Sequence, residues 1–163
     1  MLDSRVPLRA WFAALGVGCL GLVAMGMELQ SLLRLAPCPL CIFQRVLYIG
    51  LGVVGLLGFA LPVLRTLWFA LVGAISGLGF AVAAYQSWMQ AYPHLAKECS
   101  YSDPNLIERL VDWLGMQAPG MFLATGFCTS REWEFLGGSM ANWSVLIFAV
   151  ILLGLALLLK RKA

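Results

Sequence analysis

Two cysteines separated by two residues, Cys38 and Cys41, stand at the start of a long apolar segment. A Cys-x-x-Cys pair is either a redox couple or half of a metal site. An arginine, Arg45, follows four residues after Cys41, deeper in the apolar segment. The two thiols thus stand where a membrane helix begins, and a cation follows one turn further along it. This placement indicates electron transfer between thiols and a lipid-soluble acceptor.

The prolines beside the pair predict where the helix begins. Pro37 blocks helix before Cys38, and Pro39 suits the first helical position. We therefore expect Cys38 to cap the helix and Cys41 to take its third position, where backbone N–H groups and the helix dipole stabilise a thiolate. Arg45 lies on the same face and adds a permanent positive charge. An ionisable residue inside a span is a functional candidate; the alternative is that its charge extends to the lipid headgroups.

Three further cysteines leave several kinds of site possible. Cys99 and Cys128 flank apolar segments, whereas Cys19 lies inside one and is expected to be a small packing residue. Four cysteines can form a zinc or iron–sulfur site, but such sites usually carry two closely spaced pairs. Inert structural disulfides are another alternative. The pattern favours redox catalysis, with no metal ligand assigned.

The composition is typical of a protein embedded in a lipid bilayer. The chain has 163 residues, of which 61% are hydrophobic and 12% charged, and its mean hydropathy is +0.88. A soluble domain carries roughly 25% charged residues. Aromatic residues interleaved with basic ones are missing, so we exclude nucleic-acid binding. A span needs about 20 apolar residues, and we expect one membrane domain over residues 1–163 with spans at about 10–29, 42–61, 67–91 and 141–159.

Basic residues gather at one end of the predicted bundle. Four spans place both termini on one side, and six of the eleven basic residues lie in the two tails and in the turn after the second span. The positive-inside rule makes that face cytoplasmic. The four flanking cysteines belong to the opposite face, in two outer loops at about 30–41 and 92–140, and seven of the eight acidic residues lie in these loops or at their edge. We therefore predict an all-α membrane protein, an antiparallel four-helix transmembrane bundle whose cysteines face an oxidising compartment.

The second outer loop contains a predicted short amphipathic helix at residues 102–115. Asp103 is a fitting N-cap, Pro104 a fitting first helical residue and Gly115 a plausible stop. Between two spans, such a helix is expected to lie flat on the outer leaflet. Its flanks contain prolines and glycines and are expected to be mobile, and each carries one cysteine.

Two stretches of the chain resemble a known family. Residues 37–45 (PCPLCIFQR) resemble the signature of DsbB, the bacterial disulfide bond formation protein B, and residues 124–137 (ATGFCTSREWEFLG) are a second match. The resemblance covers nearly the whole chain: four spans, a Cys-x-x-Cys in the first outer loop and two spaced cysteines in the second. The vitamin K epoxide reductase-like bundle is a related alternative, and the early position of Cys38 and Cys41 disfavours it.

The resemblance implies a disulfide-forming thiol:quinone oxidoreductase of the bacterial inner membrane, with cytoplasmic termini and periplasmic cysteines. A DsbA-like oxidase of thioredoxin fold would attack the Cys99–Cys128 disulfide at Cys99. The Cys38–Cys41 pair would then reoxidise the second-loop pair through a transient Cys38–Cys128 bond. Cys41 would pass two electrons to the membrane pool of ubiquinone or menaquinone. A partner potential of roughly −120 mV requires a strong final oxidant, which fits a quinone.

The resemblance also implies residues of the quinone site. Arg45 matches the family's quinone-site arginine, and Met140 matches a residue that lines the site. Gln86 is the candidate for a polar side chain near the outer end of the third span. The non-catalytic alternative is a disulfide-stapled or metal-binding membrane protein.

Overall fold

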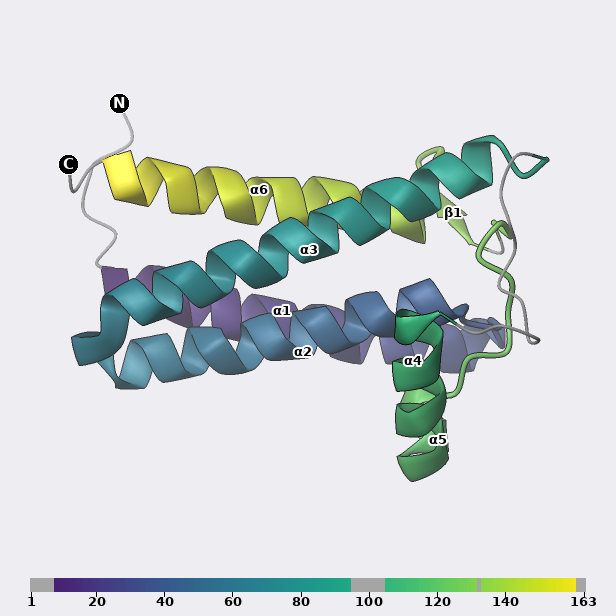
Figure 1. Ribbon diagram of the computed structural model, residues 1–163, viewed down its shortest axis with the longest axis horizontal. Helices are drawn as coiled ribbons and strands as arrows, with labels where there is room; N and C mark the ends of the chain where they lie inside the picture. Colours follow the sequence, from purple (N-terminus) through teal and green to yellow (C-terminus); the bar gives the residue numbers. More distant parts are fainter. Residues whose placement is uncertain (1–7, 95–104, 132, 161–163) are drawn as a thin grey trace.

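The computed structural model describes residues 8–94, 105–131 and 133–160, and four long apolar helices dominate it (Figure 1). Each is long and apolar enough to cross a bilayer, so the chain is a multi-pass membrane protein. The predicted all-α four-helix bundle is confirmed. The four helices are α1 (Leu8–Leu33), α2 (Pro39–Ala60), α3 (Arg65–Ala91) and α6 (Met140–Lys160), with a 3-10 turn, η1 (Pro62–Leu64), before α3.

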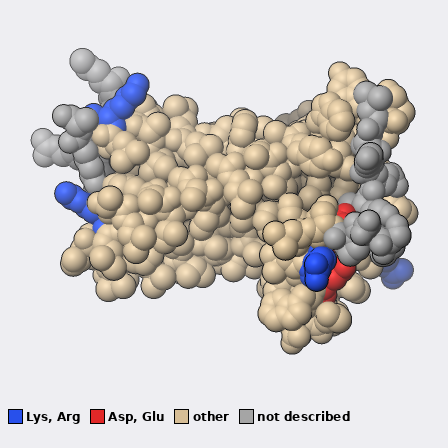
Figure 2. Space-filling view, in the orientation of Figure 1, with Lys and Arg blue, Asp and Glu red and all other residues tan. Residues whose placement is uncertain are grey.

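The bundle has two layers, one formed by α1 and α2 and the other by α3 and α6, with α2 also packed against α3 (Figure 1). Successive long helices run in opposite directions. The start of α1 and the end of α6 therefore lie at one end, here called the terminal end, and α2 begins at the other, the cysteine end. On the face shown in Figure 2, charged side chains occupy the two ends and the body between them is uncharged.

Glycines bring α1 and α2 into close contact. A Cβ atom on Gly55 would lie 2.6 Å from the backbone nitrogen of Gly16 and 2.9 Å from the carbonyl oxygen of Phe12. Small residues allow such close approach where helices meet in a membrane. On the other side of α2, the rings of Tyr48 and Phe148 stack with centroids 4.6 Å apart and join α2 to α6. These contacts fix the position of α2, the helix that carries the cysteine pair.

The predicted start of the second-loop helix is wrong. The helix is α4 (Leu106–Gln117), and its N-cap is Asn105. The Asn105 side chain accepts from the backbone nitrogen of Glu108 at 3.0 Å, and the Glu108 carboxylate accepts from the backbone nitrogen of Asn105 at 2.7 Å. This reciprocal capping box satisfies two N–H groups, which a cap at Asp103 would not do. Asp103 and Pro104 themselves lie outside the described residues.

The predicted stop of the same helix is also wrong, because α4 continues past Gly115 to Gln117. A proline follows at the start of the short helix α5 (Pro119–Phe122). Gly115 serves packing instead, since a Cβ there would lie 3.2 Å from the carbonyl oxygen of Phe122. The break between α4 and α5 therefore depends on the proline and on Ala118, the C-cap of α4.

Helix α4 is amphipathic and lies across the bundle axis at the cysteine end (Figure 1). Val111 and Glu108 are buried, and α4 contacts α2. Leu106 and Met116 are 83% and 74% exposed, so part of its apolar surface faces away from the bundle.

A two-stranded hairpin that the sequence did not predict precedes α6. Strand β1 (Glu134–Phe135) pairs antiparallel with β2 (Gly138–Ser139). Both residues of the connecting turn, Leu136 and Gly137, have positive φ values of 52° and 77°. Two successive positive φ values give a turn whose twist matches a hairpin, and glycine favours the second position.

Candidate redox site

Cys38 and Cys41 lie where the prolines predicted, at the first turn of α2. Cys38 is the N-cap, with an extended backbone, and Pro39 opens the helix. The backbone nitrogen of Cys41 donates to the sulfur of Cys38 at 3.4 Å, and the two sulfurs lie 3.1 Å apart as hydrogen-bonded thiols. Cys38 is buried and Cys41 is partly exposed. The helix start thus holds the two sulfurs within reach of a disulfide bond.

A buried amide from α3 contacts both thiols. The Nε2 atom of Gln86 lies 3.0 Å from the sulfur of Cys41 and 3.3 Å from the sulfur of Cys38. Its Oε1 atom accepts from Nε2 of Gln44 on α2 at 2.6 Å. The resemblance implied Gln86 as a candidate quinone contact, which stays a prediction; the structure shows Gln86 in contact with the two sulfurs. Gln44 was missed, although a polar residue three positions after Cys41 in an apolar span was a signal.

The segment that carries Cys128 is docked against the first loop. The backbone nitrogens of Thr125 and Gly126 donate to the carbonyl oxygen of Pro37 at 2.9 and 3.1 Å. Cys128 is buried and hydrogen-bonds the side chain of Cys38. Three of the four predicted cysteines therefore meet in one cluster, and the arm expected to be mobile is tied to the first loop here.

Cys99, the fourth predicted cysteine, lies outside the described residues. Within the described part of the chain, no three His, Cys, Asp or Glu side chains form a group that could hold a metal ion.

The surroundings of Cys38 favour its protonated form. Hydrogen bonds with Cys128 and then with Cys41, together with burial, raise the pKa of the Cys38 thiol well above its usual range. Cys38 therefore keeps its proton at neutral pH in the reduced protein and can donate it to the sulfur of Cys41. The sulfur of Cys41 also accepts from the amide of Gln86, so two donors point at it.

Arg45 is partly buried and lies one turn along α2 from Cys41. Its guanidinium donates to the carbonyl oxygen of Met121 in α5 and, at 2.6 Å, to Oε1 of Gln30 in α1. These bonds join α1, α2 and α5. Both bonds bind the charge to the protein, which favours a role of Arg45 in the site over a charge extended to the headgroups.

A cavity of about 240 Å³ opens beside the thiols at the cysteine end. Most of its wall is apolar, with contributions from all four long helices. The predicted residues that border it are Cys38, Cys41, Arg45, Gln86 and Met140. An apolar cavity with a few convergent polar groups is the usual form of a small-molecule site.

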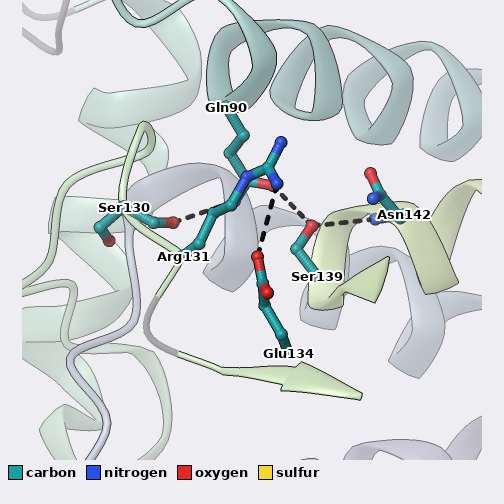
Figure 3. A network of polar contacts seen from close by, with 6 residues as sticks. All are labelled: Gln90, Ser130, Arg131, Glu134, Ser139 and Asn142. Carbon is teal, nitrogen blue, oxygen red and sulfur yellow. Dashed lines mark hydrogen bonds and ion pairs between the residues drawn. The ribbon is translucent and has the colours of Figure 1, made fainter. Parts of the chain in front are cut away.

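A second amide of α3, Gln90, holds the wall of this cavity together (Figure 3). Its Nε2 atom donates to the carbonyl oxygen of Ser130 at 3.0 Å, and its Oε1 atom accepts from the hydroxyl of Ser139 at 2.6 Å. The hydroxyl of Ser139 also accepts from the backbone nitrogen of Asn142 at 3.4 Å. Gln90 thereby connects α3 to the segment after Cys128 and to the start of α6.

An exposed ion pair lies in the segment between Ser130 and Ser139, the two residues that Gln90 contacts. Arg131 and Glu134 approach to 3.4 Å, and both side chains are about 40% exposed (40% and 44%). Exposed pairs of this kind contribute little to stability. The buried contacts of Gln90 are therefore the stronger link between the loop and the bundle.

Comparison with known proteins gives one consistent family. The family model described as disulfide bond formation protein DsbB matches residues 8–158. A curated protein of Dechloromonas aromatica, "Disulfide bond formation protein B", is 70% identical over 162 residues, covering 99% of this chain and 98% of its own length. Proteins with the same description from Verminephrobacter eiseniae and Azoarcus sp. are each 38% identical; they cover 97% and 98% of this chain, and 89% and 95% of their own lengths.

Proposed function

The chain belongs to the DsbB family of disulfide bond formation proteins, and from this premise we propose that it is a membrane thiol:quinone oxidoreductase. In this proposal it reoxidises a periplasmic DsbA-like dithiol oxidase and relays two electrons through two cysteine pairs. The observation that carries the proposal is the contact of three thiols, Cys38, Cys41 and Cys128, beside an apolar cavity.

The first exchange brings electrons from the partner to the second-loop pair. A thiolate of the partner attacks Cys99 of a Cys99–Cys128 disulfide, and Cys128 leaves as a thiolate. The partner's second thiolate then breaks the mixed disulfide, so the partner leaves oxidised and Cys99 and Cys128 are reduced. Each exchange forms one S–S bond and breaks one, and the rate depends on the attacking thiolate and on the leaving group.

The second exchange moves the two electrons to the membrane pair. The thiolate of Cys128 attacks Cys38 of a Cys38–Cys41 disulfide, and Cys41 leaves. Cys99 then attacks Cys128, which restores the second-loop disulfide and releases Cys38 as the second thiol. The hydrogen bond between Cys128 and Cys38 supports this order, because it places the attacking and attacked sulfurs together. The donor from Gln86 supports Cys41 as the leaving group.

The residues around the cavity fit a quinone ring. A cavity of 150 Å³ already accepts benzene, and this one is about 240 Å³ with an apolar wall. Arg45 offers N–H groups near the cavity, Gln86 borders the cavity, and Met140 offers an apolar surface. A bound quinone would supply the final acceptor for two electrons and two protons. The sulfur of Cys41 borders the cavity and is the sulfur from which the electrons would leave.

The proposed location is the bacterial inner membrane, with the terminal end in the cytoplasm and the cysteine end in the periplasm. Arg9, Arg65 and Lys160 stand at the beginning or end of long helices at the terminal end, which supports this orientation.

Quinone reduction by the purified protein tests the proposal. The protein is mixed with a reduced DsbA-like partner and with ubiquinone or menaquinone analogues, and quinone absorbance is followed. We expect quinone reduction by the unmodified protein and none by Cys41→Ser. Cys19→Ala is the matched control, because Cys19 is buried in α1 outside the thiol cluster. Unchanged quinone turnover in Cys41→Ser would contradict the mechanism.

A further inference from the structure

The pair of amides Gln44 and Gln86 is almost completely buried, at 4% and 1% exposure, inside two apolar helices. A buried amide is unfavourable unless its hydrogen bonds are made. Leucine at either position would avoid that penalty. The two amides therefore need a role beyond packing, and their contacts indicate one.

The contact between the two amides fixes the orientation of Gln86. Its Oε1 atom accepts from Gln44 at 2.6 Å, so its two N–H groups point to the other side. There they meet two sulfurs, Cys41 at 3.0 Å and Cys38 at 3.3 Å. An amide has two N–H donors, and each sulfur receives one. Gln44 touches neither sulfur in these contacts and acts through Gln86.

Donors directed at sulfur do not favour the two redox states equally. A thiolate is a charged acceptor, and hydrogen bonds to charged groups are stronger than those to neutral ones. The sulfurs of a disulfide are neutral and gain less from the same donors. The amide contact therefore stabilises the reduced pair relative to the disulfide, which makes the disulfide a stronger oxidant.

We propose that Gln86, oriented by Gln44, shifts the redox equilibrium of the Cys38–Cys41 pair toward the dithiol. The inference deepens the proposed function, since a more oxidising membrane pair drives electrons away from the second-loop pair. Gln86 is the donor to the sulfurs, and Gln44 is a positioning residue.

The equilibrium with glutathione tests this inference without quinone or partner. The full-length protein in detergent micelles is equilibrated with mixtures of reduced and oxidised glutathione. In this reaction two glutathione thiols reduce the Cys38–Cys41 disulfide to the dithiol and become one glutathione disulfide. The fraction of Cys38–Cys41 disulfide is measured by differential alkylation and peptide mass spectrometry. Failure of the proposed function would appear in the quinone assay and would leave this measurement unaffected.

We expect Gln86→Leu to shift the equilibrium constant about tenfold toward the disulfide, which for two electrons is about 30 mV. Gln44→Leu should shift it in the same direction by a smaller factor, about threefold, because the donor remains and loses its orientation. Adding Gln44→Leu to Gln86→Leu should have no further effect, since Gln44 acts only through Gln86. A merely structural role would instead give additive effects.

The control is Ser76→Ala, a buried polar position of α3 away from the sulfurs, which should leave the equilibrium constant unchanged. Gln86→Met, which keeps the length of the side chain and lacks its N–H groups, repeats the test if Gln86→Leu does not fold. An unchanged equilibrium constant in both Gln86 variants overturns the inference. A shift toward the dithiol, or a further shift in the double variant, also overturns it.

Discussion

Cys38, the residue directly before α2, has two structural roles. Its sulfur accepts the backbone N–H of Cys41, as a capping side chain does, and it also contacts the sulfurs of Cys41 and Cys128. Capping fixes the backbone around Cys38, and the thiol contacts place it between the two cysteine pairs. One residue therefore couples the start of the helix to the exchange of disulfides.

The protonated state of Cys38 gives a dependence of stability on pH. Its pKa in the folded, reduced protein is raised by Cys128, by Cys41 and by burial, so the folded state holds the proton more tightly than the unfolded state. The contribution is fully present below the unfolded thiol pKa of about 8.5 and is lost as pH rises toward the folded value. In this window the free energy of unfolding should fall by up to about 1.4 kcal/mol per pH unit.

The measurement is denaturing-detergent unfolding of the reduced protein between pH 8 and pH 10. Cys38→Ala provides the reference, and its free energy of unfolding should fall less steeply with pH. Equal slopes in the two proteins would show that Cys38 has an ordinary pKa.

Arg45 should affect quinone affinity far more than partner affinity. Its charge borders the cavity, whereas the proposed partner would meet the cysteines of the second loop. A hydrogen bond to a charged group contributes about 1.5–3 kcal/mol, so Arg45→Ala should raise the KM for quinone at least tenfold. The KM for the reduced partner should stay within about twofold.

Steady-state kinetics with each substrate varied in turn measures the two constants. Arg109→Ala, on an exposed position of α4, is the control and should change neither. Equal increases in both KM values would count against a role in the quinone site.

At the scale of single residues, the sequence predicted those features of the site that are determined by residues nearby in the chain. The Pro-Cys-Pro pattern gave the helix start, the cap and the position of Cys41. Gln44 was missed, because its importance depends on Gln86, 42 residues away, and no local rule connects them. Gln86 was predicted as a residue of the site, but its contact with the sulfurs came only from the fold.

The same holds for helices and loops: features determined by nearby residues were predictable, and features determined by distant segments were not. The long helices follow from apolar composition and length. The start of α4 was placed two residues early, because Asp103 and Asn105 are both good caps and the choice depends on the glutamate three residues later. The docking of residues 124–128 on the first loop could not be foreseen, since it rests on backbone contacts between distant segments.

Gly126 permits this docking, and it gives a prediction at the scale of elements. A Cβ atom at this position would lie 2.0 Å from the carbonyl oxygen of Ala36, and backbone cannot yield as a flexible side chain can. Gly126→Ala must therefore move the Cys128 segment away and break its bonds to Pro37. We expect formation of a Cys38–Cys128 disulfide under mild oxidation to slow at least tenfold, since intramolecular reactions depend steeply on placement.

The crosslink is followed by peptide mass spectrometry in protein that carries Cys41→Ser and Cys99→Ser, so that the two sulfurs have few other partners. Gly120→Ala is the matched control, because a Cβ there meets no atom within 4 Å. Formation of the Cys38–Cys41 disulfide in otherwise unmodified protein should be the same with and without Gly126→Ala. Equal rates of crosslinking in the two glycine variants would show that the docking is unimportant for exchange.

At the scale of the whole molecule, the fold separates two kinds of surface. The body of the bundle is uncharged on the face shown in Figure 2, and charged side chains stand at its two ends. The three described cysteines of the site all lie at the cysteine end, with the cavity beside them. In the proposed function, a soluble partner would meet this end from the aqueous side, and a lipid-soluble acceptor would reach Cys41 through the cavity.

The orientation of the bundle is the last prediction, and it follows from the charges at the two ends. Basic residues at the terminal end should hold that end in the cytoplasm. Single cysteines introduced at Val63 and Asp112, in a variant without native cysteines, report the two sides. Val63 in η1 is 90% exposed at the terminal end, and Asp112 is exposed on α4 at the cysteine end. With a permeabilised outer membrane, a membrane-impermeant maleimide should label Asp112→Cys in intact cells and Val63→Cys only after the inner membrane is disrupted. The reverse pattern would place the thiol cluster in the reducing cytoplasm, where its disulfides would not persist.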